Sequence, residues 1–229
     1  MTSDPDIASV GSLLGDGARA QMLLALLGGD ALSAGRLAEI GGVSPSGATA
    51  HIRRLRDGGL VTCERSGRRL LVRLANDETA AALEALARIA PRPPVRTLRQ
   101  SAADDALRRA RTCYDHLAGE LGVAVTDALV ERKLLRAGDG AFDVPAAGVS
   151  WFGQLGVDVE QVRERRRAFA RECVDWTERR PHLAGALGAG LADAFVARRF
   201  VERLPGGRAL AVTSAGRRWL RRELALDLA

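Results

Sequence analysis

Two cysteines and two histidines recur at matched places in the second half of the sequence. Cys113 precedes His116 in "CYDHLAG", and Cys173 precedes His182 in "CVDWTERRPHLAG". Thiolate sulfur and imidazole nitrogen are ligands that zinc and other soft metals prefer, and paired cysteines can also act as a thiol switch. A spacing of three residues would put Cys113 and His116 on one face of a helix. These four residues are therefore candidates for an effector site, a soft metal site or a thiol switch.

The alternative for the same residues is ordinary packing. Cysteine is among the residue types most often buried, and neither spacing matches a compact metal-ligand motif. We therefore expect no bound cofactor and keep a soft metal at these four residues as the alternative. Trp151, Trp176 and Trp219 pose a similar choice, since they can line an aromatic pocket or fill a core. We include Trp151 and Trp176 among the effector candidates.

The elements around these residues form an internal repeat. The segment "HLAGELGVAVTDALVERKLL" from His116 and the segment "HLAGALGAGLADAFVARRFV" from His182 are identical at ten of twenty positions. Each unit is predicted to run helix, HLAG corner, helix, hairpin, helix, which is close to a winged-helix plan. A long helix from Val159 to about Arg180 is predicted to join the units, which would span about residues 101–157 and 158–229.

Two such units can pack as a pseudo-twofold pair that encloses a space. The helices after the two HLAG corners carry small apolar residues where a DNA-reading helix needs polar and basic ones. We therefore expect this domain to sense an effector and to support dimerisation, with an organic effector held between the two units.

Positive charge gathers in the first third of the chain. The whole sequence has a net charge of +6, and the segment from His51 to Arg73 contains seven arginines against Asp57 and Glu64. Such a local excess is typical of a phosphate-binding surface, although a solvated charged face would have the same composition.

The pattern of this region favours the DNA-binding interpretation. Short helices are predicted over "GARAQMLLALLG" and after Ser33, and a third helix begins at Ser44 with Ala48, Ile52 and Leu55 on its buried side. The segment "LVTCERSGRRLLVRL" then alternates as two strands around a turn at Ser66-Gly67. Together they predict a winged helix-turn-helix. The predicted DNA contacts are Ser44, Ser46, Thr49, His51, Arg53 and Arg54 in the third helix and Arg65, Arg68 and Arg69 in the wing.

Residues 16–74 resemble the ArsR/SmtB transcriptional repressors. The pattern "VSxSxxSxHLxxLRxxGLV" of that family is matched here by "VSPSGATAHIRRLRDGGLV". The resemblance implies a dimeric repressor that leaves its operator when an effector binds. The metal-sensing members carry a cysteine pair before the recognition helix, whereas "LSAGRLAE" has none, and "NDETAAALEALARIA" lacks the histidines of the alternative site. Metal sensing at those two family sites is therefore not expected.

The expected fold is mainly α-helical with short β-hairpins, in two domains of residues 1–92 and 93–229. An amphipathic helix over 77–90, with Leu83, Leu86 and Ile89 on one side, would pack on its own domain or against a partner subunit. "PRPPV" from Pro91 marks the boundary between the domains.

The functional expectation is a sequence-specific, effector-responsive repressor. Its partners would be an operator in double-stranded DNA, a second copy of the chain and a small-molecule effector. No nucleotide-binding loop or nucleophile motif points to an enzyme. The polar N-terminus and the lack of long apolar runs favour a cytoplasmic location without membrane contact. The alternative is a non-sensing or architectural DNA-binding protein whose C-terminal domain is a dimer scaffold.

Overall fold

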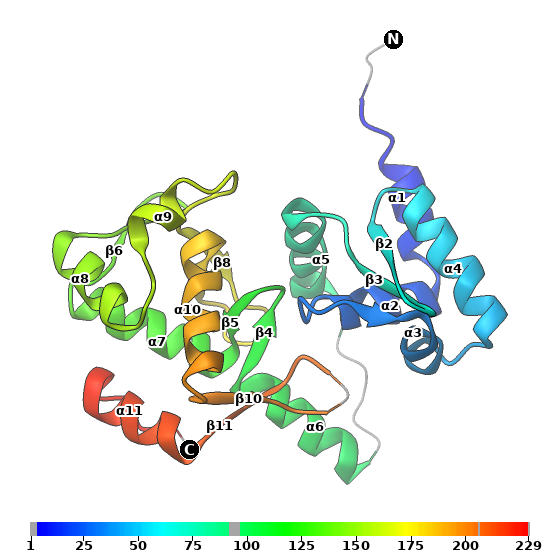
Figure 1. The fold of residues 1–229 in the computed structure, drawn as a ribbon. Helices are drawn as coiled ribbons and strands as arrows, with labels where there is room; N and C mark the ends of the chain where they lie inside the picture. The colour runs from blue at the N-terminus through cyan, green and yellow to red at the C-terminus, as the bar shows by residue number, and fades with distance from the viewer. Residues whose placement is uncertain (1–3, 92–96, 206, 229) are drawn as a thin grey trace. The chain divides into compact units, whose positions relative to one another are not determined.

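The computed structural model describes residues 4–91, 97–205 and 207–228. The chain divides into two compact units, Met1–Leu86 and Ala87–Ala229 (Figure 1). The boundary predicted at residue 92 falls within 92–96, which lie outside the described residues. No helix in the described ranges has both the length and the apolar character to cross a membrane.

The N-terminal unit is the predicted winged helix-turn-helix. Its antiparallel sheet has the strand order β1-β3-β2, in which Leu32 pairs with Val72 and Val61 pairs with Leu74. Helix α1 was not expected from the sequence, and none of its residues is buried. The elements are α1 (Ile7–Leu14), α2 (Gly17–Leu26), β1 (Leu32–Ser33), α3 (Ala34–Gly41), α4 (Pro45–Asp57), β2 (Val61–Ser66), β3 (Arg69–Leu74) and α5 (Asp77–Ile89).

Local capping fixes the turn between α3 and α4. The backbone N–H of Arg36 donates to the Ser33 hydroxyl oxygen at 3.2 Å, and α3 ends at Gly42, whose φ of 62° suits glycine. The N–H of Gly47 then donates to the Ser44 hydroxyl at 3.1 Å, which begins α4. These bonds satisfy helix-end groups with nearby side chains, and for this reason the sequence predicts both helices well.

The C-terminal unit repeats the order hairpin, helix, hairpin, helix. The first copy is β4 (Arg111–Cys113), β5 (His116–Ala118), α7 (Gly119–Glu131), β6 (Arg136–Ala137), β7 (Phe142–Asp143) and α8 (Ala146–Gln154). The second copy is β8 (Arg171–Val174), β9 (Pro181–Ala184), α10 (Gly185–Ala197), β10 (Val201–Arg203), β11 (Leu210–Val212) and α11 (Ser214–Leu224). Helix α6 (Leu98–Arg109) precedes the first copy, and α9 (Val159–Arg163) lies between the two. The winged-helix character of each copy stays a prediction.

Two expectations for this unit are wrong. The HLAG segments are strands that lead into helices, and helix α9 ends at Arg163 instead of continuing to Arg180. The second error has a physical cause in the side chain of Asp175. Its carboxylate accepts hydrogen bonds from the backbone N–H groups of Thr177 and Glu178, which holds a turn, and the preceding residues pair as β8 with β9. Tertiary pairing thus overrides the helical propensity of the arginine-rich segment.

The glycines of the repeated HLAGxLG segment explain its sequence. Gly119 and Gly185 begin their helices with φ of 75° and 78°, a region that favours glycine. At Gly122 and Gly188, an added Cβ would lie 2.4 Å and 2.5 Å from a carbonyl oxygen of the preceding strand. The close approach of helix to strand in both copies therefore requires these glycines.

The two copies pack reciprocally around one core. The N–H of Phe142 donates to the Ala170 carbonyl at 2.8 Å, and the N–H of Leu210 donates to the Ala110 carbonyl at 2.8 Å. Helix α7 likewise contacts β9, while α10 contacts β5. This exchange has the form of the predicted pseudo-twofold pair. The shared core includes Leu121, Leu129, Phe152, Leu187, Phe195 and Leu220.

Candidate DNA-binding surface and buried cysteine-histidine cluster

Helix α4 presents one apolar and one polar face. Ala48, Ile52 and Leu55 are buried against the rest of the N-terminal unit. The opposite face meets solvent, which is the arrangement that a helix needs to enter a major groove. The exposed residues of the predicted set on this helix and at its cap are Ser44, Ser46, Thr49, Arg53 and Arg54.

Two of the predicted α4 contacts are already engaged within the unit. The Thr49 hydroxyl donates to the carbonyl of Pro45 at 2.9 Å, and the Ser44 hydroxyl caps the helix. His51 does not join the exposed face. Its side chain is half-buried, with Nδ1 3.4 Å from Arg19 and 3.8 Å from an Asp16 carboxylate oxygen. His51 therefore connects α4 to α2, and the structure offers no support for a DNA contact there.

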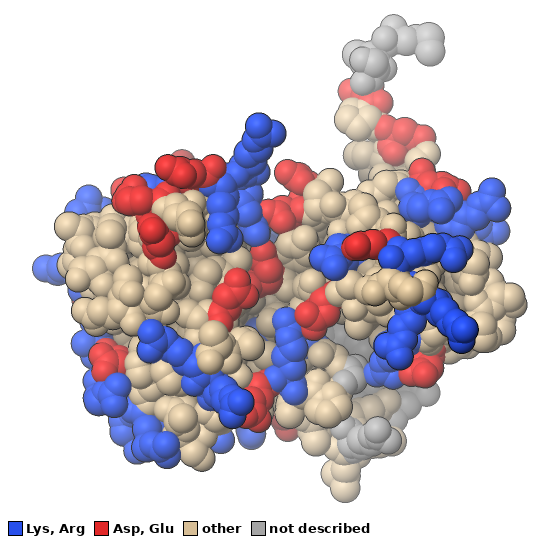
Figure 2. All heavy atoms as spheres, in the orientation of Figure 1, with Lys and Arg blue, Asp and Glu red and all other residues tan. Residues whose placement is uncertain are grey.

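The wing carries the remaining predicted contacts. Arg65, Arg68 and Arg69 are exposed on either side of Gly67, whose φ of 59° forms the tight turn between β2 and β3. Within the part of the chain that the structure describes, these three arginines and Arg54 form no ion pair. Basic side chains are visible on the surface of the N-terminal unit, on the right of Figure 2. Cations without an internal partner are available to bind phosphate groups.

Cys113, His116, Cys173 and His182 form one buried cluster in the C-terminal unit. Cys113 lies directly opposite His116 in the β4-β5 hairpin, and Cys173 lies directly opposite His182 in the β8-β9 hairpin. The expectation that Cys113 and His116 share a helical face is therefore wrong, because the two residues between them form the turn of a hairpin. The reciprocal packing of the two copies then brings the hairpins together.

The donor atoms of the cluster lie close to one another. The two sulfur atoms are 3.8 Å apart, and the Nε2 atoms of His116 and His182 are 3.1 Å apart. All four donor atoms lie within 4.8 Å of one another, and all four residues are buried. The sulfur separation is far beyond the length of a disulfide bond, and both cysteines are free.

Two ion pairs of opposite charge lie near this cluster. The Arg111 guanidinium donates to an Asp175 carboxylate oxygen at 2.8 Å, and both side chains are fully buried. The other close pair is Arg167 with Asp115. The Asp115 carboxylate also lies 3.3 Å from Nδ1 of His116. Sequence reasoning missed Arg111 and Asp175, because nothing in either local segment indicates that they meet.

The surroundings shift the protonation of the cluster. A hydrogen bond from Cys113 lowers the pKa of the Cys173 thiol far below its usual range, against the opposing effect of burial. Burial lowers the pKa of His116, but its hydrogen bonds to Asp115 and Cys173 outweigh burial and raise that pKa above its ordinary value. These shifts favour the thiolate form of Cys173, which is the form of cysteine that binds metals, and the protonated form of His116.

The remaining effector candidates lie outside the four-residue cluster. Trp151 packs against Trp219, with ring centroids 5.9 Å apart, and is partly buried against the core. The Trp176 ring lies 4.6 Å from the Arg111 guanidinium. The tryptophans thus contribute to packing and to a cation-π contact.

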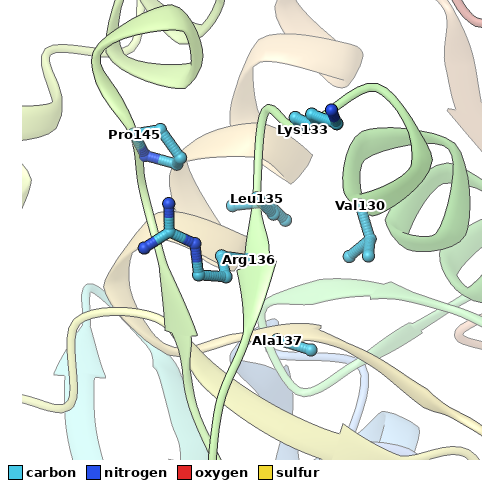
Figure 3. Close-up of a pocket in the computed structure, with 6 residues that line it drawn as sticks. All are labelled: Val130, Lys133, Leu135, Arg136, Ala137 and Pro145. Carbon is cyan, nitrogen blue, oxygen red and sulfur yellow. The ribbon is translucent and has the colours of Figure 1, made fainter.

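A separate cavity of about 430 Å³ opens in the first copy of the repeat. Figure 3 shows its lining, in which Lys133 and Arg136 accompany apolar side chains. All of the lining residues belong to this one copy, so the cavity is not the space predicted between the copies. They are Val130, Lys133, Leu135, Arg136, Ala137 and Pro145.

Known proteins resemble this chain both locally and over nearly its whole length. A family model described as a helix-turn-helix domain matches residues 14–64. Similar solved structures include reduced HlyU from Vibrio cholerae, at 27% identity over 38% of this chain and 90% of that one, with a TM-score of 0.34. The cadmium sensor CmtR from Mycobacterium tuberculosis is 33% identical over 39% of this chain and 97% of its own, with a TM-score of 0.31.

A relative from Bacillus subtilis covers both units. The HTH-type transcriptional regulator YdfF is 41% identical over 214 residues, which are 93% of this chain and 95% of that protein. The helix-turn-helix match, the exposed recognition helix and the wing agree with this relationship. The chain therefore belongs to the family of HTH-type transcriptional regulators.

Proposed function

We propose that the protein is a homodimeric, effector-responsive repressor that binds an inverted repeat in double-stranded DNA. The observation that carries the DNA-binding part is the exposed polar face of α4 together with three exposed wing arginines that pair with no acidic group among the described residues. In a twofold dimer, the two α4 helices enter successive major grooves about 34 Å apart, so the half-sites lie about one helical turn apart.

Apolar side chains exposed at the surface support dimerisation. Ile7 and Val10 on α1 are 77% and 41% exposed, and Leu86 and Ile89 on α5 are 43% and 80% exposed. Covering such apolar surface with a second copy removes it from water, which favours association. Analytical ultracentrifugation of Ile7→Glu and Ile89→Glu variants locates the interface, since a charge placed there shifts the chain toward monomer.

Variants separate the two kinds of DNA contact. We expect Arg68→Ala with Arg69→Ala to weaken binding to all sequences. The slope of log affinity against log salt concentration should fall by about 2, at about 0.9 for each lost phosphate contact. Thr49→Ala or Arg53→Ala should instead reduce binding to the operator, by about 1–3 kcal/mol for a lost base contact. The measurement is fluorescence anisotropy with operator and scrambled duplexes at several salt concentrations.

The matched control is Arg132→Ala, which removes an exposed arginine from the C-terminal unit. It should leave both affinities unchanged. If every variant lost the same binding affinity for operator as for scrambled DNA, this result would contradict the reading of bases by α4. Unchanged affinity of the double wing variant at every salt concentration would contradict the wing assignment.

Effector response is the second part of the proposal. The cavity beside Lys133 and Arg136 has a size suited to a small molecule, and its apolar wall with two cations suits a small organic anion. Operator affinity measured across a series of aromatic and aliphatic carboxylates tests this idea, with matched neutral amides as controls. A dimer scaffold without sensing would show no ligand-dependent change in DNA affinity.

A further inference from the structure

We propose that Cys113, His116, Cys173 and His182 form a tetrahedral Zn²⁺ site at the centre of the C-terminal unit. The proposal rests on that unit alone, so it stands or falls independently of the DNA-binding proposal. The site is also distinct from the two family sites that the sequence makes improbable, since all four residues belong to the repeated hairpins.

The separations within the cluster match those of a zinc tetrahedron. Zinc binds thiolate sulfur at about 2.3 Å and imidazole nitrogen at about 2.0–2.1 Å. In a regular tetrahedron these bonds place two sulfurs about 3.8 Å apart and two nitrogens about 3.3–3.4 Å apart. The observed separations are 3.8 Å between the sulfurs and 3.1 Å between the Nε2 atoms. The four donor atoms lie within 4.8 Å of one another, whereas a sulfur and a nitrogen of that tetrahedron are about 3.5 Å apart. Side-chain shifts of about 1 Å would therefore complete a four-coordinate site.

The charge of the complex suits its burial. Zn²⁺ with two thiolates and two neutral imidazoles has no net charge, and any protons that the four ligands hold pass to the solvent as the metal binds. The nearby charges already have partners, Arg111 with Asp175 and Arg167 with Asp115. Burying the loaded cluster therefore adds no uncompensated charge to the interior.

Carboxylates lie on the far side of both imidazole rings. Nδ1 of His116 is 3.3 Å from Asp115, and Nδ1 of His182 is 3.8 Å from Asp175. Among the described residues, His182 Nδ1 is a buried polar atom that has no hydrogen bond. A carboxylate beside one ring nitrogen orients the imidazole so that the other nitrogen points at the metal. Both Nε2 atoms here point toward the cluster, as that role requires.

The ligand set points to a structural role. Four buried protein ligands leave no position for water or substrate, which distinguishes a structural zinc site from a catalytic one. Because each copy of the repeat supplies one cysteine and one histidine, the ion joins the two copies. Zinc binding should therefore stabilise the folded C-terminal unit.

Titration of the full chain tests the site directly. The reduced, chelator-treated protein is titrated with Co²⁺, whose absorption reports tetrahedral geometry and sulfur ligation, and then with Zn²⁺. We expect one Co²⁺ per chain, a sulfur-to-cobalt charge-transfer band, and complete displacement by Zn²⁺. Cys113→Ser with Cys173→Ser should abolish the band, whereas Cys63→Ser and His51→Gln, which alter residues outside the cluster, should keep it.

A second variant keeps the test valid even if the double cysteine variant does not fold. Asp115→Asn keeps all four ligands and should lower Zn²⁺ affinity by about 10- to 100-fold. Zn²⁺ should also raise the melting temperature of the wild-type chain in a concentration-dependent manner. The proposal is overturned if the reduced wild-type chain binds neither ion, or if the charge-transfer band persists in the double cysteine variant.

Discussion

Removing the carboxylate of Asp175 should destabilise the C-terminal unit strongly. This side chain is fully buried and accepts hydrogen bonds from the Arg111 guanidinium at 2.8 Å and from the Gly119 N–H at 2.7 Å. Its other oxygen accepts from Thr177 and Glu178. Asp175→Ala leaves the buried Arg111 cation with the Leu107 carbonyl and the Thr177 hydroxyl, which are neutral acceptors. Removing one partner of a buried ion pair costs about 3–5 kcal/mol, and we expect a loss of unfolding free energy in that range.

Tryptophan fluorescence provides a selective assay. The chain has three tryptophans, Trp151, Trp176 and Trp219, and all of them belong to the C-terminal unit. Urea unfolding followed by their emission therefore reports the unit in which the substitution lies. Wild type and variant are compared at the same Zn²⁺ concentration, so that the metal available to both proteins is the same.

A double variant tests the electrostatic reasoning. Arg111→Met with Asp175→Ala removes both charges, and an apolar replacement of a buried pair is often tolerated. We expect the double variant to be more stable than the sum of the two single effects predicts, by about 2 kcal/mol, within the range seen for interacting pairs. A loss below about 1 kcal/mol for Asp175→Ala, or additive effects in the double variant, would refute the reasoning.

Two further substitutions test the helix geometry. Gly122→Ala should destabilise the C-terminal unit by about 1–3 kcal/mol, because its Cβ would lie 2.4 Å from a backbone carbonyl oxygen. Gly153→Ala on α8 is the control, since its added Cβ would meet no described atom within 4 Å apart from its chain neighbours and the backbone of its own helix, and it should stabilise by about 0.5–1 kcal/mol. Equal effects in urea unfolding would contradict the steric argument. Ser44→Ala should cost the N-terminal unit about 0.5–2 kcal/mol through loss of the α4 cap. Circular dichroism should detect this loss, and a shift confined to the tryptophan-reported transition would argue against it.

The DNA-binding helix could be predicted because its determinants are local. Ser44 caps the helix, Pro45 occupies its first turn, and a buried stripe recurs at helical spacing, so one short segment contains the whole signal. The wing is equally local, since its two strands are joined by a tight turn at Gly67. His51 is the exception, because its neighbour Asp16 comes from another helix.

The four residues of the cysteine-histidine cluster could be named as candidates from the sequence, but their meeting in one cluster could not be predicted. The repeat indicated that segments 113–116 and 173–182 are equivalent, although their cysteine-histidine spacings differ. Both spacings fit a hairpin with cysteine opposite histidine, which a helical interpretation of the shorter spacing concealed. The meeting of the two hairpins depends on packing between residues 60 and 66 positions apart. The Arg111-Asp175 pair spans 64 positions and has no local signature. Such contacts depend on how the whole core packs, and a short segment of sequence gives no sign of them.

The reciprocal packing of the repeat also determines the order in which the chain matures during synthesis. The contacts of the N-terminal unit, such as α3 with α4, β2 with β3 and β1 with β3, join elements within the first third of the chain. Each half of the C-terminal unit instead hydrogen-bonds to the other, through Phe142 with Ala170 and Leu210 with Ala110. Loops of this length close slowly, and domains generally fold N-terminal first as they leave the ribosome.

A nascent chain therefore completes its DNA-reading unit while the first copy of the repeat still awaits the second. During this interval α7 and β5 contact α6, β4 and each other but lack their contacts with β9 and α10, which are not yet synthesised. Two nascent chains on one messenger would offer each other the missing surface. The internal duplication thus creates a period in which pairing between copies of two different chains competes with correct folding.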